Sequence, residues 1–142
     1  MMIKIRPEQL EVFRPAIDNA LAGKFAEALR ERHPGVIVRL PSGAVELAEL
    51  SDSVLRKLVR PRMARAREYG LGSEPALLAF VSLSLVRAPN FDSHPLIQRV
   101  LKDATVAPDA RLELLGERIS DQTWEVVERE YDPSAWEIGD EA

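Results

Sequence analysis

The sequence predicts an all-α fold, a single compact bundle of five to six helices around a buried central helix at about residues 74–87. Apolar residues recur at three- and four-residue steps along most of the chain, which is the spacing of amphipathic helices. Serine, proline and glycine residues stand where such helices would begin and end. A β-branched run typical of a strand occurs only at residues 36–40.

The first element expected is a long amphipathic helix over about residues 8–33. Its apolar positions are Leu10, Phe13, Ile17, Leu21, Phe25, Ala28 and Leu29. Pro15 should kink this helix or split off its first turns, because proline lacks an N–H and crowds the preceding turn. After the helix, Pro41-Ser42-Gly43 indicates a turn, and residues 44–50 are expected to form one or two helical turns.

A second helix is expected over about residues 52–69, capped by Ser51 or Asp52 and ended by Gly70. Pro61 lies in its middle, so we expect a bend near Arg60.

Ser73-Glu74-Pro75 indicates the start of the third helix, since it combines a hydroxyl cap, an acidic first turn and an early proline. The helix that follows is apolar on nearly every side, which is typical of a helix enclosed by others. This is the predicted centre of the bundle.

The rest of the chain predicts shorter helices. One covers about residues 94–103 and is capped by Ser93 or Asp92, and the next opens at Pro108-Asp109 and breaks at Ser120-Asp121. We therefore expect a helical domain at residues 1–132 and an acidic, mobile C-terminal tail at residues 133–142. Trp136 and Ile138 offer an alternative, in which the tail docks on the domain.

Composition excludes several kinds of chemistry. The chain of 142 residues has no cysteine and two histidines, which excludes disulfides, thiol nucleophiles and iron–sulfur clusters. We expect no metal and no cofactor, since neither histidine belongs to a carboxylate cluster with ligand spacing. The longest apolar stretch is far shorter than a membrane span, and no targeting signal is visible, so we expect a cytoplasmic protein that does not bind membranes.

Positive charge is concentrated in the second helix. Residues 51–70 hold six basic and two acidic residues, although the whole chain has a net charge of −4. The candidate partner-binding residues here are Arg56, Lys57, Arg60 and Arg67. They indicate either a solvated face paired with the acidic tail or a site for an acidic protein. Nucleic acid is not expected, because the chain is acidic overall and has no nucleic-acid-binding motif.

Negative charge is concentrated at the other end, where residues 109–142 hold eleven carboxylates and three arginines. The recurring acidic positions are Glu113, Glu117, Asp121, Glu125 and Glu128. They indicate either a solvated face or a docking strip for a basic protein, with Trp124 and Trp136 as candidate interface anchors.

One loop gathers groups that some enzymes use. Asp92, Ser93 and His94 bring together a carboxylate, a hydroxyl and an imidazole, so a small hydrolase or transferase is one hypothesis. The alternative is a helix-capping loop that Phe91 anchors in the core and in which Pro95 opens the helix. Ser82 and Ser84 in the apolar helix are expected to bond to their own helix.

Four segments carry a resemblance to a known family: residues 55–59, residues 64–71, Ser73-Glu74, and Pro89-Asn90-Phe91-Asp92. With the opening Ile5–Phe13 and Leu29–Pro34, they resemble small helical bacterial proteins encoded beside type VI secretion effector and spike genes, over about residues 3–115. The resemblance implies a non-enzymatic protein-interaction module, namely an adaptor or chaperone for a secreted effector. An immunity-type inhibitor of a neighbouring toxin is the alternative.

Overall fold

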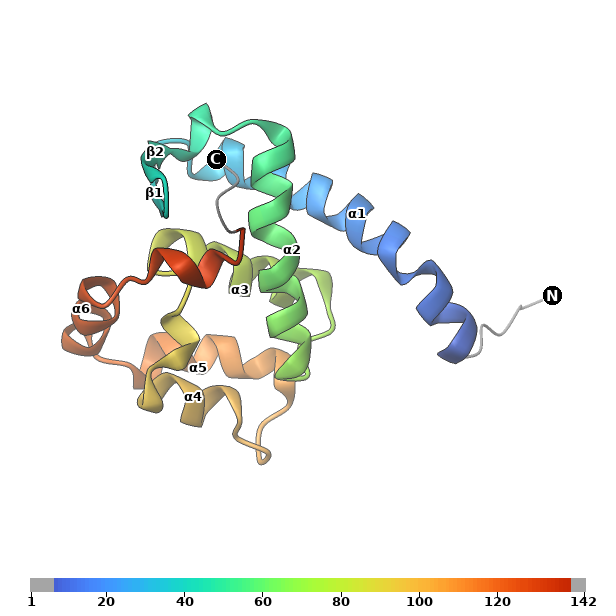
Figure 1. Ribbon diagram of the computed structural model, residues 1–142. Helices are drawn as coiled ribbons and strands as arrows, with labels where there is room; N and C mark the ends of the chain where they lie inside the picture. Colours follow the sequence, from blue (N-terminus) through green and yellow to red (C-terminus); the bar gives the residue numbers. More distant parts are fainter. Residues whose placement is uncertain (1–6, 139–142) are drawn as a thin grey trace.

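The computed structural model describes the backbone of residues 7–138 and the side chains of residues 15–138. Over this range the protein is mostly helical, with one two-stranded sheet (Figure 1). The elements are α1 (Pro7–Arg32), β1 (Ile37–Leu40), β2 (Gly43–Glu46), α2 (Asp52–Glu68), α3 (Glu74–Val86), α4 (Pro95–Leu101), α5 (Arg111–Arg118) and α6 (Asp121–Arg129). Short 3-10 turns lie at residues 47–49, 91–93, 108–110 and 133–136.

Serine caps begin three of the helices; the sequence predicts the caps at Ser51 and Ser73, and the third, Ser120, lies at the predicted break. The hydroxyl of Ser51 accepts from Val54 N–H, that of Ser73 from Ala76 N–H, and that of Ser120 from Thr123 N–H. Gly70 follows the end of α2 and has φ +91°, a conformation that residues with a Cβ rarely adopt.

Neither internal proline ends its helix. α1 runs unbroken from Pro7 to Arg32 through Pro15, so the first turns are not split off. α2 likewise continues past Pro61 to Glu68.

The strict all-α prediction is wrong, because residues 43–46 form a strand instead of a helical turn. β1 and β2 form an antiparallel hairpin in which Val38 pairs with Val45 and Leu40 with Gly43. Gly43 has φ +139°, which the tight Pro41-Ser42 connection requires. Val38 is fully buried, so the hairpin is held to the domain on one face.

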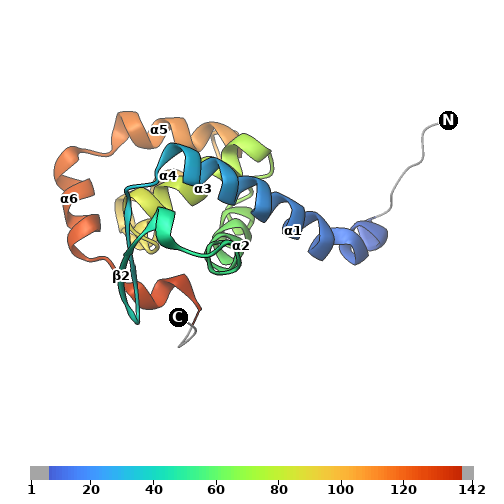
Figure 2. The same cartoon turned by 90° about the horizontal axis from the view of Figure 1, so that it is seen from above.

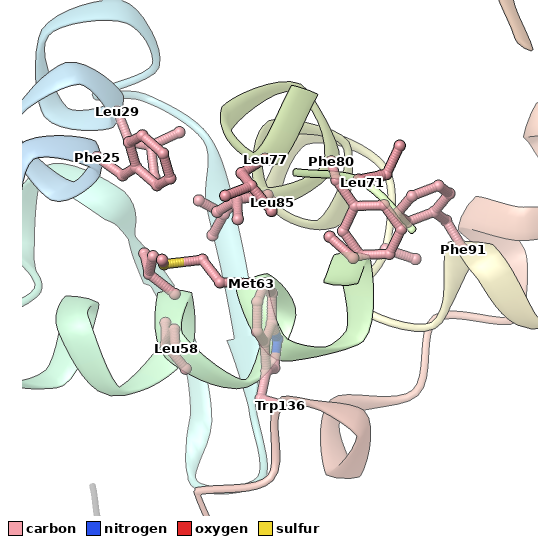
Figure 3. Close-up of a cluster of buried hydrophobic side chains, with 14 of the residues drawn as sticks. Phe25, Leu29, Leu58, Met63, Leu71, Leu77, Phe80, Leu85, Phe91 and Trp136 are labelled. Atoms are coloured by element: carbon pink, nitrogen blue, oxygen red, sulfur yellow. The ribbon is translucent and has the colours of Figure 1, made fainter. Parts of the chain in front are cut away.

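The core includes side chains from α1, α2, α3 and the turns at residues 91–93 and 133–136 (Figure 3). The same cluster of buried residues extends to β1, α4, α5 and α6. α3 supplies Leu77, Phe80 and Leu85, each no more than 1% exposed. α3 is nevertheless not enclosed on every side, since Ala79 is exposed and Val86 is 41% exposed. The prediction of a fully buried central helix is therefore too strong, because an apolar helix can still leave part of its surface uncovered.

Residues 133–138 pack on the domain instead of leaving it as a separate tail. Trp136 is 1% exposed, and its indole N–H donates to the Tyr131 hydroxyl at 2.9 Å. The chain after Tyr131 thereby contributes to the core, which is the docked alternative considered for Trp136 and Ile138. Residues 139–142 of the expected tail lie outside the described residues.

Candidate functional site

The first half of α1 projects from the rest of the protein, and we call residues 7–20 the arm. Both views show this part of the helix running away from the other elements (Figure 1, Figure 2). Among the described side chains of the arm, none is buried, and Ala22 is the first buried residue in the part of α1 whose side chains are described. One ion pair holds the base of the arm, at 2.8 Å between Asp18 and Arg67.

A helix that projects from a domain without packing partners is unusual. A helix of 14 residues spans roughly 20 Å and is only marginally stable in water without packing partners. Ile17 is 42% exposed, and Ala16 and Ala20 beside it are exposed too. The arm therefore presents apolar surface that nothing else in the described part of the chain covers.

An apolar groove lies between the second half of α1 and α3. It encloses about 410 Å³ and is lined by Lys24, Phe25, Ala28, Arg32, Glu74, Pro75, Leu78, Ala79 and Ser82. A salt bridge of 2.8 Å between Lys24 and Glu74 joins the two helices there. Since Ala28, Ala79 and Ser82 are small, a further helix can approach closely.

A cluster of charged and polar side chains is buried elsewhere, between α2 and the loop at residues 89–93. We call Arg62, Arg65, Tyr69 and Asp92 the Asp92 cluster. Asp92 Oδ2 accepts from Arg65 Nε at 2.7 Å and from the Tyr69 hydroxyl at 2.8 Å. Arg62 Nη1 lies 3.5 Å from Asp92 Oδ1 and donates to the Pro89 carbonyl at 2.6 Å. Asp92 is 2% exposed and Arg62 5% exposed, so both charges are removed from water.

The environment shifts the pKa values of three members of the cluster. The hydrogen bond to Asp92 raises the pKa of Arg65, while burial lowers the pKa of Arg62 against the opposing attraction of Asp92. Burial, with the hydrogen bond to Asp92, raises the pKa of Tyr69 to about 12. Tyr69 is thus a neutral donor near pH 7, and the cluster ties the loop to α2.

The structure gives Asp92 and His94 different partners. The Asp92 carboxylate points to the two arginines and Tyr69, whereas His94 Nδ1 accepts from Leu96 N–H and caps α4. The prediction that Ser93 or Asp92 caps this helix is therefore wrong. Phe91 is fully buried and anchors the loop, as expected, and Ser84 bonds to its own helix at the Phe80 carbonyl.

A polar cavity of about 310 Å³ opens beside the Asp92 cluster. Its charged lining consists of Arg62, Arg65, Glu68, Asp92 and Glu137. Arg65 already donates to Glu68, Tyr69 and Asp92, so its guanidinium is committed to the protein itself.

The predicted basic face of α2 is largely neutralised. Arg56 pairs with Asp52 at 2.7 Å, and Arg67 pairs with Asp18 at 2.8 Å. Lys57 and Arg60 are exposed. The counter-charges recorded for Arg56 and Arg67 come from α1 and α2, not from the acidic C-terminal segment.

The predicted acidic strip is divided between two helices. Glu117 lies on α5, whereas Asp121, Glu125 and Glu128 lie on α6. Glu117, Asp121 and Glu125 are exposed, and none forms an ion pair with another described residue. Glu128 instead pairs with Arg87 at 3.0 Å.

Trp124 is not available as an exposed interface anchor. It is 7% exposed, lies 6.4 Å from the Phe91 ring between centroids, and has the Arg87 guanidinium 5.0 Å above its own ring. Its role is packing, and the same is true of Trp136.

The Asp92 cluster was not identified from the sequence, although a signal exists. Arg62 and Tyr69 occupy the same three- and four-residue spacing as Leu55, Val59 and Ala66, which form the buried face of α2. An arginine on a buried face requires an acidic partner. Asp92 is the first carboxylate in the loop that follows α3.

Comparisons with known proteins give no assignment: no family model, no curated protein and no solved structure matches this chain. Within residues 15–138 no histidine and carboxylate side chains gather into a metal-binding group. No helix in the described part of the chain has both the length and the apolar character to cross a membrane.

Proposed function

We propose that the protein is a non-enzymatic protein-interaction module that engages its partner through the arm of α1. The observation that carries this proposal is the arm itself, in which Ala16, Ile17 and Ala20 are exposed and none of the described side chains is buried. Helices that expose apolar side chains can lie in apolar grooves of other proteins, where their ordering and burial are coupled.

The resemblance over residues 3–115 supports a partner from the type VI secretion machinery. We therefore propose an accessory adaptor or chaperone in the cytoplasm, acting on an effector or spike protein encoded nearby.

The exposed acidic residues favour a second candidate function. Glu117, Asp121 and Glu125 form no ion pair within the described chain. Their negative charges can therefore attract a basic protein. A basic cleft in a toxin fits such a surface, and the alternative function is therefore an immunity-type inhibitor.

Co-expression with the neighbouring gene product tests the proposal. Affinity purification should recover that protein with the wild type, and Ile17→Glu should weaken capture at least ~10-fold because it puts a charge into the exposed apolar surface of the arm. Ala104→Glu, at an exposed position of the loop between α4 and α5, is the matched control and should leave capture unchanged.

Capture that is insensitive to Ile17→Glu would remove the arm from the proposal. Charge reversal at Glu117, Asp121 and Glu125 then tests the acidic surface. Growth rescue from a co-expressed toxin separates the inhibitor from the adaptor, since an adaptor has no need to protect the host.

A further inference from the structure

A second groove lies between α4, the loop that follows it and the end of α5, and we call it the α4–α5 groove. It encloses about 570 Å³. This volume lies within the range of ~300–1,000 Å³ that is typical of ligand pockets. Both views place α4 and α5 away from the arm of α1 (Figure 1, Figure 2). The groove is therefore a surface separate from the one that carries the proposed function.

Part of the lining of the α4–α5 groove is apolar. Leu96 and Val100 lie one helical turn apart on α4, and Ile119 follows the last residue of α5. Val100 is 5% exposed and Ile119 is 8% exposed, so both lie deep, whereas Leu96 is 44% exposed. An exposed large apolar side chain beside two deeper ones favours an occupant that brings apolar groups of its own.

The charged part of the lining is mostly basic. Arg99, Lys102 and Arg118 stand against a single carboxylate, that of Asp103, which gives the lining a net charge of +2. The whole chain has a net charge of −4, so the groove has the opposite sign. Positive charge gathered in a concave surface attracts anionic groups.

These cations are largely uncompensated within the protein. Arg99 and Lys102 are exposed, and neither forms an ion pair with another described residue. Arg118 Nη1 lies 3.5 Å from Asp103 Oδ2, at the outer limit of a hydrogen bond. Asp103 Oδ1 accepts from Thr105 N–H at 2.9 Å, and the hydrogen bonds from Thr105 hold the pKa of Asp103 below its usual range. The one carboxylate of the lining is thus engaged with its own loop.

We propose that the α4–α5 groove binds an acidic segment of another protein, one that carries a large apolar side chain next to its carboxylates. The apolar side chain lies on Leu96, and the carboxylates pair with Arg99 and Lys102. The inference goes beyond the proposed function, because it assigns a second surface and a second kind of partner segment. A chain with both surfaces can hold two protein segments at once.

Other anionic ligands match the lining less well. A flat anionic membrane does not reach the deep Val100 and Ile119. Nucleic acid supplies phosphates but no aliphatic side chains for the apolar part, and the net charge of −4 opposes its approach. A short acidic segment with an apolar side chain matches both parts of the groove.

Selection of random peptides displayed on phage tests the proposal. Phage that bind the Arg99→Glu/Lys102→Glu double variant are removed first, so that the selection on the immobilised wild type reports on the groove. The enriched peptides should combine carboxylates with a large apolar residue. Enrichment of basic or uncharged peptides, or no enrichment at all, overturns the inference.

Fluorescence anisotropy with the most enriched peptide measures each part of the lining. Leu96→Asp and Arg99→Glu should each weaken binding at least ~10-fold. The matched controls are Val86→Asp, at an apolar residue of α3 that is 41% exposed, and Arg129→Glu, at an exposed arginine of α6. Both controls should bind like the wild type, and a control that weakens binding as much as the groove variants overturns the inference. Circular dichroism and thermal melting establish that each variant is folded.

Two further measurements separate this inference from its alternatives. Ile17→Glu in the arm should bind the peptide like the wild type, so loss of capture through the arm refutes the proposed function and leaves the groove intact. A single-stranded oligonucleotide and phosphatidylserine vesicles serve as competitors. If either binds more tightly than the peptide and depends on Arg99, the acidic protein segment is the wrong occupant.

Discussion

Replacing Asp92 by asparagine should destabilise the protein strongly. Asp92 is 2% exposed and accepts from Arg65 Nε at 2.7 Å and from the Tyr69 hydroxyl at 2.8 Å. Arg62, which is 5% exposed, also has Asp92 as its acidic neighbour, at 3.5 Å. Asparagine keeps the volume and removes the negative charge, so the buried positive charge of Arg62 loses its compensation.

The magnitude follows from this burial. Removing one partner of a buried ion pair costs about 3–5 kcal/mol, because the remaining charge stays out of water. For a domain of this size, each kcal/mol lowers the melting temperature by roughly 3–4 °C, so the expected loss is roughly 10–20 °C.

Urea unfolding and thermal melting, both followed by circular dichroism, measure this effect. Asp121→Asn is the matched control, since Asp121 is exposed in the first turn of α6 and should cost no more than about 1 kcal/mol. An Asp92→Asn variant that unfolds within about 1 kcal/mol of the wild type would refute the view that Asp92 compensates a buried charge.

Three further predictions concern stability. Trp136→Ala should cost about 3–5 kcal/mol in urea unfolding, because the side chain is 1% exposed, and a cost below about 1 kcal/mol would contradict docking of residues 133–138. Ser73→Ala should cost about 1 kcal/mol through loss of the α3 cap, whereas Ser53→Ala, at an exposed position in α2, should be nearly neutral. The raised pKa of Tyr69 adds stability that is complete below pH 10 and lost as the pH rises to about 12, and Tyr69→Phe should flatten that alkaline slope.

Helix positions were predictable because the local signals are strong and short-ranged. Ser51 and Ser73 each accept from a backbone N–H three residues later, which depends on local sequence alone. Gly70 has the positive φ that its place after α2 predicted.

The hairpin was mispredicted because its second strand has no local signal. Residues 44–46 read Ala-Val-Glu, and alanine and glutamate favour helix in isolation. Pairing of Val45 with the buried Val38 overrides that preference, and the pairing is a contact that composition does not reveal.

The candidate site was predictable only in part. The sequence predicted the apolar stripe of α1, but it gave no indication that none of the described side chains of α1 before Ala22 is buried. That outcome depends on which other elements pack against α1, which is a tertiary property. Conversely, counting charges along α2 treated Arg62 and Arg65 as surface residues, whereas they compensate Asp92.

Hydrogen–deuterium exchange of the backbone amides in residues 11–20 tests most directly whether the arm is a protein-binding element. These amides should exchange rapidly in the dilute Ile17→Glu variant, because an unpacked helix of this length opens readily. They should become protected when the wild type associates with its neighbouring partner. Protection that stays the same in the free and the associated protein would contradict binding through the arm.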